Sequence, residues 1–226
     1  MSATKSGNLL TPLMVGSVVG SIITGQINLR RGTYKPSAVA GSVLVAFGMI
    51  LFARMNGATE PNDVLVAMVI AGIGMGLLMP VYTVAVQNVA PARHMGAATA
   101  STTFFRSIGS TMGVAIFGSV LLTNYHRDFA RGVPPGISQN ALQAFSNPLL
   151  LAQLRPQLES TFAQYTNGSS ILQVLFANVR TSLLHGLQVI FFSSAVVMCA
   201  AVLLNLALKD VKLRRSHAPE PEVPVG

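Results

Sequence analysis

The residue with the clearest chemical potential is Arg106, a cation inside an apolar stretch of the chain. Threonines, a serine and a glycine recur around it at three- and four-residue spacing, which places them on one face of a helix. This polar stripe consists of Thr99, Thr102, Thr103, Arg106, Ser110 and Gly113. An arginine at the centre of a membrane helix costs roughly 2.5 to 3.5 kcal/mol. We therefore expect the stripe to line a cavity or to hold its walls together.

A second set of side chains at helical spacing precedes this stripe. It consists of Met68, Gly72, Met75, Met79, Tyr82 and Val86. Methionines adapt to varied apolar shapes and would suit a pocket for diverse molecules, although the same pattern is typical of a helix-packing face, which is the reading we favour. The candidates for a substrate cavity are Arg106, Thr103, Ser110, Thr99, Met75, Met79 and Tyr82.

Residues that could catalyse a reaction are scattered. The histidines have no acidic partner at metal-ligand spacing, and no serine or threonine lies in a nucleophile motif. The histidines are His94, His126, His185 and His217. We therefore predict no enzyme, no catalytic residue, no metal site and no cofactor. His185, at the start of the last apolar stretch, is a candidate for proton transfer, but we favour a simple hydrogen bond to its neighbours.

The composition is that of an integral membrane protein. Hydrophobic residues make up 51% of the 226 residues and charged residues only 10%, whereas soluble domains contain roughly 25% charged residues. The net charge of +8 comes from basic residues near the ends of apolar stretches. Membrane orientation explains these residues. We therefore expect the lipid bilayer, and no nucleic acid, as a partner.

The apolar stretches predict an all-α fold, a polytopic bundle of five transmembrane helices. The predicted spans are 9–27, 37–55, 64–89, 96–122 and 182–208. Residues 1–122 would hold four of them. Residues 123–181 would form a long extracytoplasmic loop, with an amphipathic helix within 149–165. Residues 209–226 are charged and proline-rich, which predicts a disordered tail.

The distribution of charge predicts the orientation. Basic residues occupy the first turn, the third turn and the tail, whereas the second loop carries Glu60 and Asp63. Because short basic loops stay inside, this places the C-terminus in the cytoplasm and the N-terminus outside, in a multi-pass protein of the cell (inner) membrane. An outside N-terminus on five spans is natural for the back end of a longer protein. We expect preceding helices that this chain lacks.

Several small residues predict close helix packing and bending. They are Gly72, Gly76, Pro80, Gly109 and Gly113. Glycines spaced by four allow backbones to approach, and a proline removes one backbone hydrogen bond. The turn Gly25–Pro36 is also punctuated by glycine and strongly basic, and its principal residues are Gly25, Arg30, Arg31, Gly32 and Lys35.

These features resemble the major facilitator superfamily. The basic turn is similar to the second copy of its loop signature, with Leu29 where the best-formed copy has an aspartate. The stretches GIGMGLLMPVYTVAVQNVAP and GAATASTTFFRSIGSTMGVAIFGSVL resemble a helix pair of the fourteen-span drug:proton antiporter branch. The resemblance implies a conformational role for the turn. It also implies the last five helices of a multidrug efflux transporter.

The resemblance further implies alternating access, proton-driven export of amphiphilic and often cationic molecules, and proton-coupling residues in the absent N-terminal part. The alternative is a non-transporting membrane subunit that packs against a partner transporter or receptor.

Overall fold

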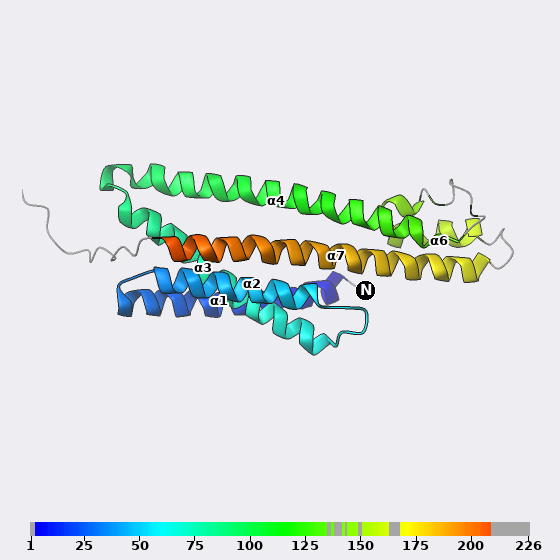
Figure 1. Cartoon of the computed structure of the whole chain (residues 1–226), viewed down its shortest axis with the longest axis horizontal. Helices are drawn as coiled ribbons and strands as arrows, with labels where there is room; N and C mark the ends of the chain where they lie inside the picture. The colour runs from blue at the N-terminus through cyan, green and yellow to red at the C-terminus, as the bar shows by residue number, and fades with distance from the viewer. Residues whose placement is uncertain are drawn as a thin grey trace, which may run out of the picture. The chain divides into compact units, whose positions relative to one another are not determined.

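The computed structural model describes residues 3–134, 137, 142, 144–148, 151–162 and 168–208. Five long helices dominate this part of the chain (Figure 1). They are α1 (Ala3–Arg31), α2 (Lys35–Ala53), α3 (Pro61–Val89), α4 (Met95–Arg131) and α7 (Gly168–Ala207). The shorter elements are η1 (Ala92–His94), η2 (Ala144–Ser146) and α6 (Leu151–Phe162). Every regular element in the described ranges is therefore a helix.

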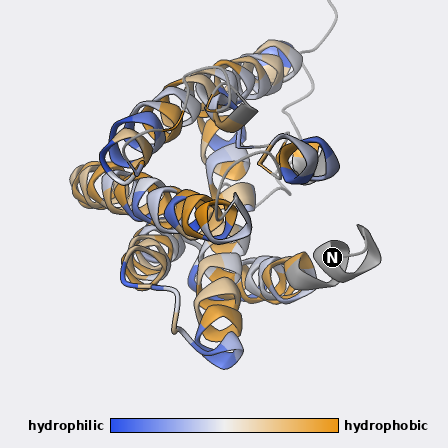
Figure 2. Ribbon diagram, turned by 90° about the vertical axis from the view of Figure 1, so that its right-hand side faces the viewer, coloured by the Kyte–Doolittle hydropathy of each residue, from blue (hydrophilic) through white to orange (hydrophobic). Residues whose placement is uncertain are grey.

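Each long helix contains a stretch long and apolar enough to cross a membrane, so the prediction of five spans in an all-α fold is confirmed. Apolar side chains remain exposed along these helices, for example Phe105 at 70% and Val114 at 76%. Figure 2 shows hydrophobic residues along most of the length of these helices. Because lipid is the apolar solvent for such faces, the chain is a multi-pass membrane protein.

Local sequence sets several helix ends. Gly32 adopts a φ of +65° directly after α1, and its amide donates to the carbonyl of Asn28 at 2.9 Å. This is the left-handed position at which a glycine commonly ends a helix. Pro36 lies in the first turn of α2, where a proline needs no hydrogen-bond partner. Helix α3 ends at Val89, shortly before Pro91.

The structure differs from the sequence prediction at several helix ends. Helix α1 continues to Arg31, so the turn is shorter than Gly25–Pro36, and Gly25 and Arg30 lie inside a helix. Helix α4 continues nine residues beyond Leu122, and α7 begins at Gly168 instead of Ser182. The predicted loop 123–181 therefore contains the ends of two helices together with η2 and α6. The predicted disordered tail, 209–226, lies outside the described residues.

Contacts divide the chain into two compact units, which we describe separately. Unit 1 contains the described residues of Met1–Ala46, Met68–Arg106 and Met198–Gly226. Unit 2 contains those of Phe47–Ala67 and Ser107–Val197. Helices α2, α3, α4 and α7 each contribute residues to both units.

In unit 1, α1 and α3 meet backbone to backbone. A methyl group on Gly72 would collide with the carbonyl oxygen of Leu13, and one on Gly76 would collide with that of Ser17. From the other side, a methyl group on Gly16 would lie 2.7 Å from the carbonyl oxygen of Val69. The predicted approach at Gly72 and Gly76 is therefore made against α1.

The turn between α1 and α2 is held by buried side chains. The hydroxyl of Ser37 donates to Oδ1 of Asn28 at 3.0 Å, which ties the start of α2 to the end of α1. Tyr34, 5% exposed, packs with Ala38 and Val81. The two arginines in the last turn of α1, Arg30 and Arg31, complement the negative end of its dipole.

Unit 2 has an aromatic core that explains the extended helices. Tyr125 and Phe129 of α4 stack at a centroid distance of 5.7 Å, and Phe129 stacks on Phe145 at 5.5 Å. The hydroxyl of Tyr125 donates to the carbonyl of Phe145 at 2.7 Å. Phe162 of α6 and Leu175 of α7 also belong to this buried cluster. Burial of these side chains stabilises helix where the polar and proline-containing sequence predicts a loop.

The loop between α2 and α3 also packs on α7 within unit 2. The rings of Phe52 and Phe191 stack at 5.0 Å. The side chain of Gln188 donates to the carbonyl of Met55 at 2.6 Å, and Arg180 donates to the carbonyl of Gly57 at 3.2 Å. Helix α7 therefore satisfies two backbone carbonyls of the loop that follows α2.

Candidate functional site

A cavity of about 410 Å³ lies between α3 and α4 in unit 1. Five of its lining residues come from α3 and two from α4: Met75, Leu78, Met79, Tyr82 and Thr83, then Thr102 and Arg106. The volume falls within the range of roughly 300–1,000 Å³ for small-molecule pockets. Most of the wall is apolar, with Arg106 and a few hydroxyls as its polar groups. Such a wall fits an amphiphilic molecule.

Arg106 supplies the positive charge of this cavity. Its Nη1 donates to the thioether sulfur of Met79 at 3.7 Å, and sulfur is a weak acceptor. The carboxylates of the described residues are Glu60, Asp63, Asp128 and Glu159, and all four belong to unit 2. Among the residues that the structure describes, unit 1 therefore offers Arg106 no carboxylate partner.

Four of the seven predicted cavity residues are brought together here: Arg106, Met75, Met79 and Tyr82. The others do not line this cavity. The hydroxyls of Thr99, Thr103 and Ser110 each donate to a backbone carbonyl of their own helix. The hydroxyl of Thr99 also accepts a hydrogen bond from Nε2 of Gln87 at 3.3 Å. Sequence reasoning assigned Thr102 to the polar stripe without naming it as a cavity residue.

Two further lining residues, Leu78 and Thr83, were missed by the sequence prediction. Leu78 follows Met75 by three residues and Thr83 follows Met79 by four. The helical period that identified the methionines therefore predicts both positions as well. Extending the apolar stripe by one residue on each turn would have found them.

Tyr82 connects the cavity wall to a buried polar network. Its hydroxyl lies 3.0 Å from Nδ2 of Asn205 on α7, and the same amide donates to the hydroxyl of Ser42 on α2 at 3.3 Å. Asn205 is 3% exposed. The network thus joins α2, α3 and α7 beside a smaller cavity of about 190 Å³ that includes Tyr34 and Lys35. Asn205, an amide within the apolar run of α7, is the sequence signal that was overlooked.

The predicted packing glycines divide into two classes. Gly72 and Gly76 contact α1, as described above, and Pro80 lies one turn later in α3. At Gly109 and Gly113 an added methyl group would meet nothing within 4 Å among the described residues. These two glycines of α4 are therefore not in a close helix contact in this structure.

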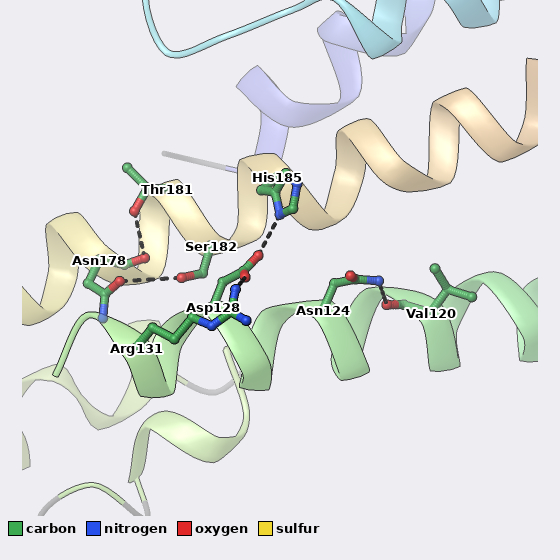
Figure 3. Close-up of polar contacts among 8 residues, drawn as sticks. All are labelled: Val120, Asn124, Asp128, Arg131, Asn178, Thr181, Ser182 and His185. Atoms are coloured by element: carbon green, nitrogen blue, oxygen red, sulfur yellow. Dashed lines mark hydrogen bonds and ion pairs between the residues drawn. The ribbon is translucent and has the colours of Figure 1, made fainter.

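A separate polar cluster joins α4 and α7 within unit 2 (Figure 3). Nδ1 of His185 lies 2.5 Å from Oδ2 of Asp128, and Nη1 of Arg131 lies 3.7 Å from the other carboxylate oxygen. Nearby, Asn178 donates to the carbonyl of Phe129 at 2.9 Å. The prediction of a histidine bonded to its neighbours fits this geometry. Sequence spacing missed its acidic partner because 57 residues separate the two.

The fold and the cavity define a polytopic helical membrane protein with a largely apolar pocket that contains one cationic side chain. The chain belongs to the Major Facilitator Superfamily, whose sequence model matches residues 1–114. This match confirms the resemblance and includes all of α1, α2 and α3 and the whole cavity lining.

Individual relatives extend the similarity over nearly the whole chain. The chain is 29% identical over 239 residues to the multidrug transporter protein MdtP of Bacillus subtilis (strain 168), covering 98% of this chain and 42% of that protein. It is 29% identical over 214 residues to multidrug resistance protein 3 of the same organism, covering 91% and 42%.

A third relative is the tetracycline resistance determinant of Streptomyces rimosus, at 26% identity over 233 residues. The match covers 98% of this chain and 65% of that protein. The chain therefore spans less than two thirds of the length of each of these curated relatives.

Proposed function

We propose that this chain is the C-terminal part of a secondary active transporter that exports drugs or other amphiphilic small molecules by alternating access. The observation that carries the proposal is the α3–α4 cavity, an apolar wall with one cation, within the region that matches the superfamily. The printed names of the relatives, two multidrug proteins and one tetracycline resistance determinant, support the same class of cargo. The protein acts by binding and movement, without making or breaking covalent bonds.

Protons are the proposed coupling ion. Arg106 cannot carry them, because a guanidinium keeps its charge at any accessible pH. Among the described residues, the walls of the cavity hold no carboxylate. The proton carrier is therefore expected in further helices of the same transporter, which also complete the substrate site. The turn containing Arg30, Gly32 and Lys35 is the proposed conformational loop, on the cytoplasmic side of the cell membrane.

Transport in everted membrane vesicles tests this function. The protein should be expressed as the cell makes it, in a bacterial host deleted for its own drug pumps. With an imposed proton gradient, vesicles should accumulate a fluorescent drug, and a protonophore should abolish the accumulation. Absence of accumulation by the intact protein would contradict the proposal and favour the non-transporting subunit.

A matched pair of variants connects transport to the cavity. Met79→Trp places a larger side chain in the lining, so we expect drug accumulation to fall at least about tenfold, because a filled pocket cannot bind. Met112→Trp changes an exposed methionine of α4 outside the lining and should leave accumulation near normal. Equal amounts of both variants in the membrane, measured by immunoblot, exclude a difference in folding yield.

A further inference from the structure

The charge of the cavity limits which amphiphiles it can bind. Arg106 is the one charged residue in the lining formed by the described residues. The acidic side chains described in the structure all belong to unit 2, so unit 1 provides no negative charge beside the cavity. A cationic ligand would therefore meet a fixed charge of its own sign beside an apolar wall.

The hydrogen-bonding capacity of the cavity has the same bias. A guanidinium carries five N–H donors, and Arg106 uses one of them on the thioether of Met79. The hydroxyls of the lining donate elsewhere: Thr102 to the carbonyl of Ala98 at 3.0 Å and Thr83 to that of Met79 at 3.5 Å. The protons of these hydroxyls are therefore engaged, and the free donors of the cavity are the remaining N–H groups of Arg106, which would be satisfied by a carboxylate or sulfonate on a ligand.

The remaining wall determines the rest of the ligand. Met75, Leu78 and Met79 are flexible or branched apolar side chains that can pack against varied hydrocarbon surfaces. We infer that this cavity binds amphiphilic anions, with an apolar body on the methionine wall and a carboxylate-like group on Arg106, in preference to cations with the same body. The inference rests on the proposed substrate cavity and narrows its cargo, since the family resemblance alone implies cationic molecules.

Equilibrium binding of two matched probes tests the inference. Dansyl-aminohexanoate and dansyl-cadaverine share a fluorophore and a spacer, and end in a carboxylate and an ammonium group. Each should be titrated by dansyl fluorescence into the purified protein as the cell makes it, in detergent. We expect the carboxylate probe to bind at least about tenfold more tightly, because the guanidinium forms charge-assisted hydrogen bonds with a carboxylate and repels an ammonium group.

Two substitutions at Arg106 assign the preference to its charge. Arg106→Gln removes the charge and should bring the dissociation constants of the two charged probes to within about threefold of each other. Arg106→Lys keeps the charge but loses the planar donor geometry of the guanidinium, so it should retain part of the preference for the carboxylate probe. Arg93→Gln is the matched control, because Arg93 is an exposed arginine of η1 outside the cavity lining. A neutral dansyl-hexylamide probe should bind all variants alike, which shows that the apolar wall is intact.

Three results would overturn the inference: tighter or equal binding of dansyl-cadaverine, a preference that persists in Arg106→Gln, or no binding of either charged probe. The second result would locate the anion site elsewhere. Equal binding is also expected if a carboxylate from another part of the transporter neutralises Arg106. Drug accumulation in vesicles together with equal probe binding would leave the proposed export intact while removing the anion preference.

Discussion

Pro80 creates a local hydrogen-bonding deficit that a neighbouring helix fills. A proline has no amide hydrogen, so the carbonyl four residues earlier, that of Gly76, loses its helical donor. The hydroxyl of Ser21 on α1 donates to that carbonyl at 3.3 Å, and Thr24 donates to the carbonyl of Leu77 at 3.2 Å. In lipid no water can replace the missing amide, so the hydroxyl of Ser21 serves as the donor to the carbonyl of Gly76.

A double-mutant cycle tests this relation. Ser21→Ala should lower the free energy of unfolding by about 1 kcal/mol, the usual size of a hydrogen bond between membrane helices. In a Pro80→Ala background the restored amide can donate to Gly76, so the same change should cost roughly half as much. The bond from Ser21 to the carbonyl of Ser17 cancels in the cycle because it is lost in both backgrounds. Thermal unfolding of the purified protein in detergent provides the measurement.

Ser193→Ala is the control for this cycle. The hydroxyl of Ser193 bonds to carbonyls of its own helix, α7. It should show no coupling to Pro80. If Ser21→Ala lowers the free energy of unfolding equally in both backgrounds, Ser21 does not compensate for the hydrogen bond that Pro80 removes.

At the scale of elements, glycines on different helices have different consequences. Gly72 and Gly76 leave no space for a methyl group against α1, whereas Gly109 and Gly113 of α4 have open space around them. The four share a helical setting and a spacing of four residues. The sequence pattern alone therefore does not distinguish the two pairs. Whether a methyl group fits at each glycine depends on whether a neighbouring helix packs against it.

Alanine substitution should separate the two pairs. Gly72→Ala or Gly76→Ala forces α1 and α3 apart and should cost about 1–3 kcal/mol of unfolding free energy, the usual range for overpacking. Gly109→Ala and Gly113→Ala should be neutral or slightly stabilising, because alanine is the better helix former. Thermal unfolding of the four variants in detergent measures this. A loss of stability at Gly109 as large as that at Gly72 would show that α4 has a tight neighbour.

The sequence predicts elements better than it predicts contacts between them. Hydropathy places five spans because each must match the bilayer on its own. The C-terminal end of α4 and the N-terminal end of α7 could not be predicted, since aromatic contacts such as Tyr125 with Phe145 stabilise them. Within the candidate site, the helical spacing of side chains along α3 is enough to identify Met75 and Met79. The partners of Tyr82 and His185 come from distant parts of the chain and leave no periodic signal.

At the scale of the molecule, the described acidic residues are confined to one of the two units. The basic turns at Arg30–Lys35 and Arg93–His94 belong to unit 1, and the described acidic residues belong to unit 2. This distribution accords with the proposed topology, in which the turns from α1 to α2 and from α3 to α4 are cytoplasmic and the loop from α2 to α3 is outside.

Cysteine labelling in a Cys199→Ala background tests this topology. An impermeant maleimide applied to intact cells should label a cysteine at Ala58, in the loop between α2 and α3, and should spare one at Thr33, in the basic turn. Permeabilised cells should label both positions, which controls for reactivity. Labelling at Thr33 but not at Ala58 in intact cells would invert the proposed orientation.

The backbone contact between α1 and α3 also affects how freely these two helices can move relative to each other. Where two helices touch through carbonyls and glycines, there is no layer of side chains that can change rotamer and let one slide along the other. We therefore expect α1 and this part of α3 to move together as one rigid body. The methionines on the cavity side of α3 can change rotamer at little energetic cost. Conformational adjustment is therefore concentrated at the surface where a substrate would bind.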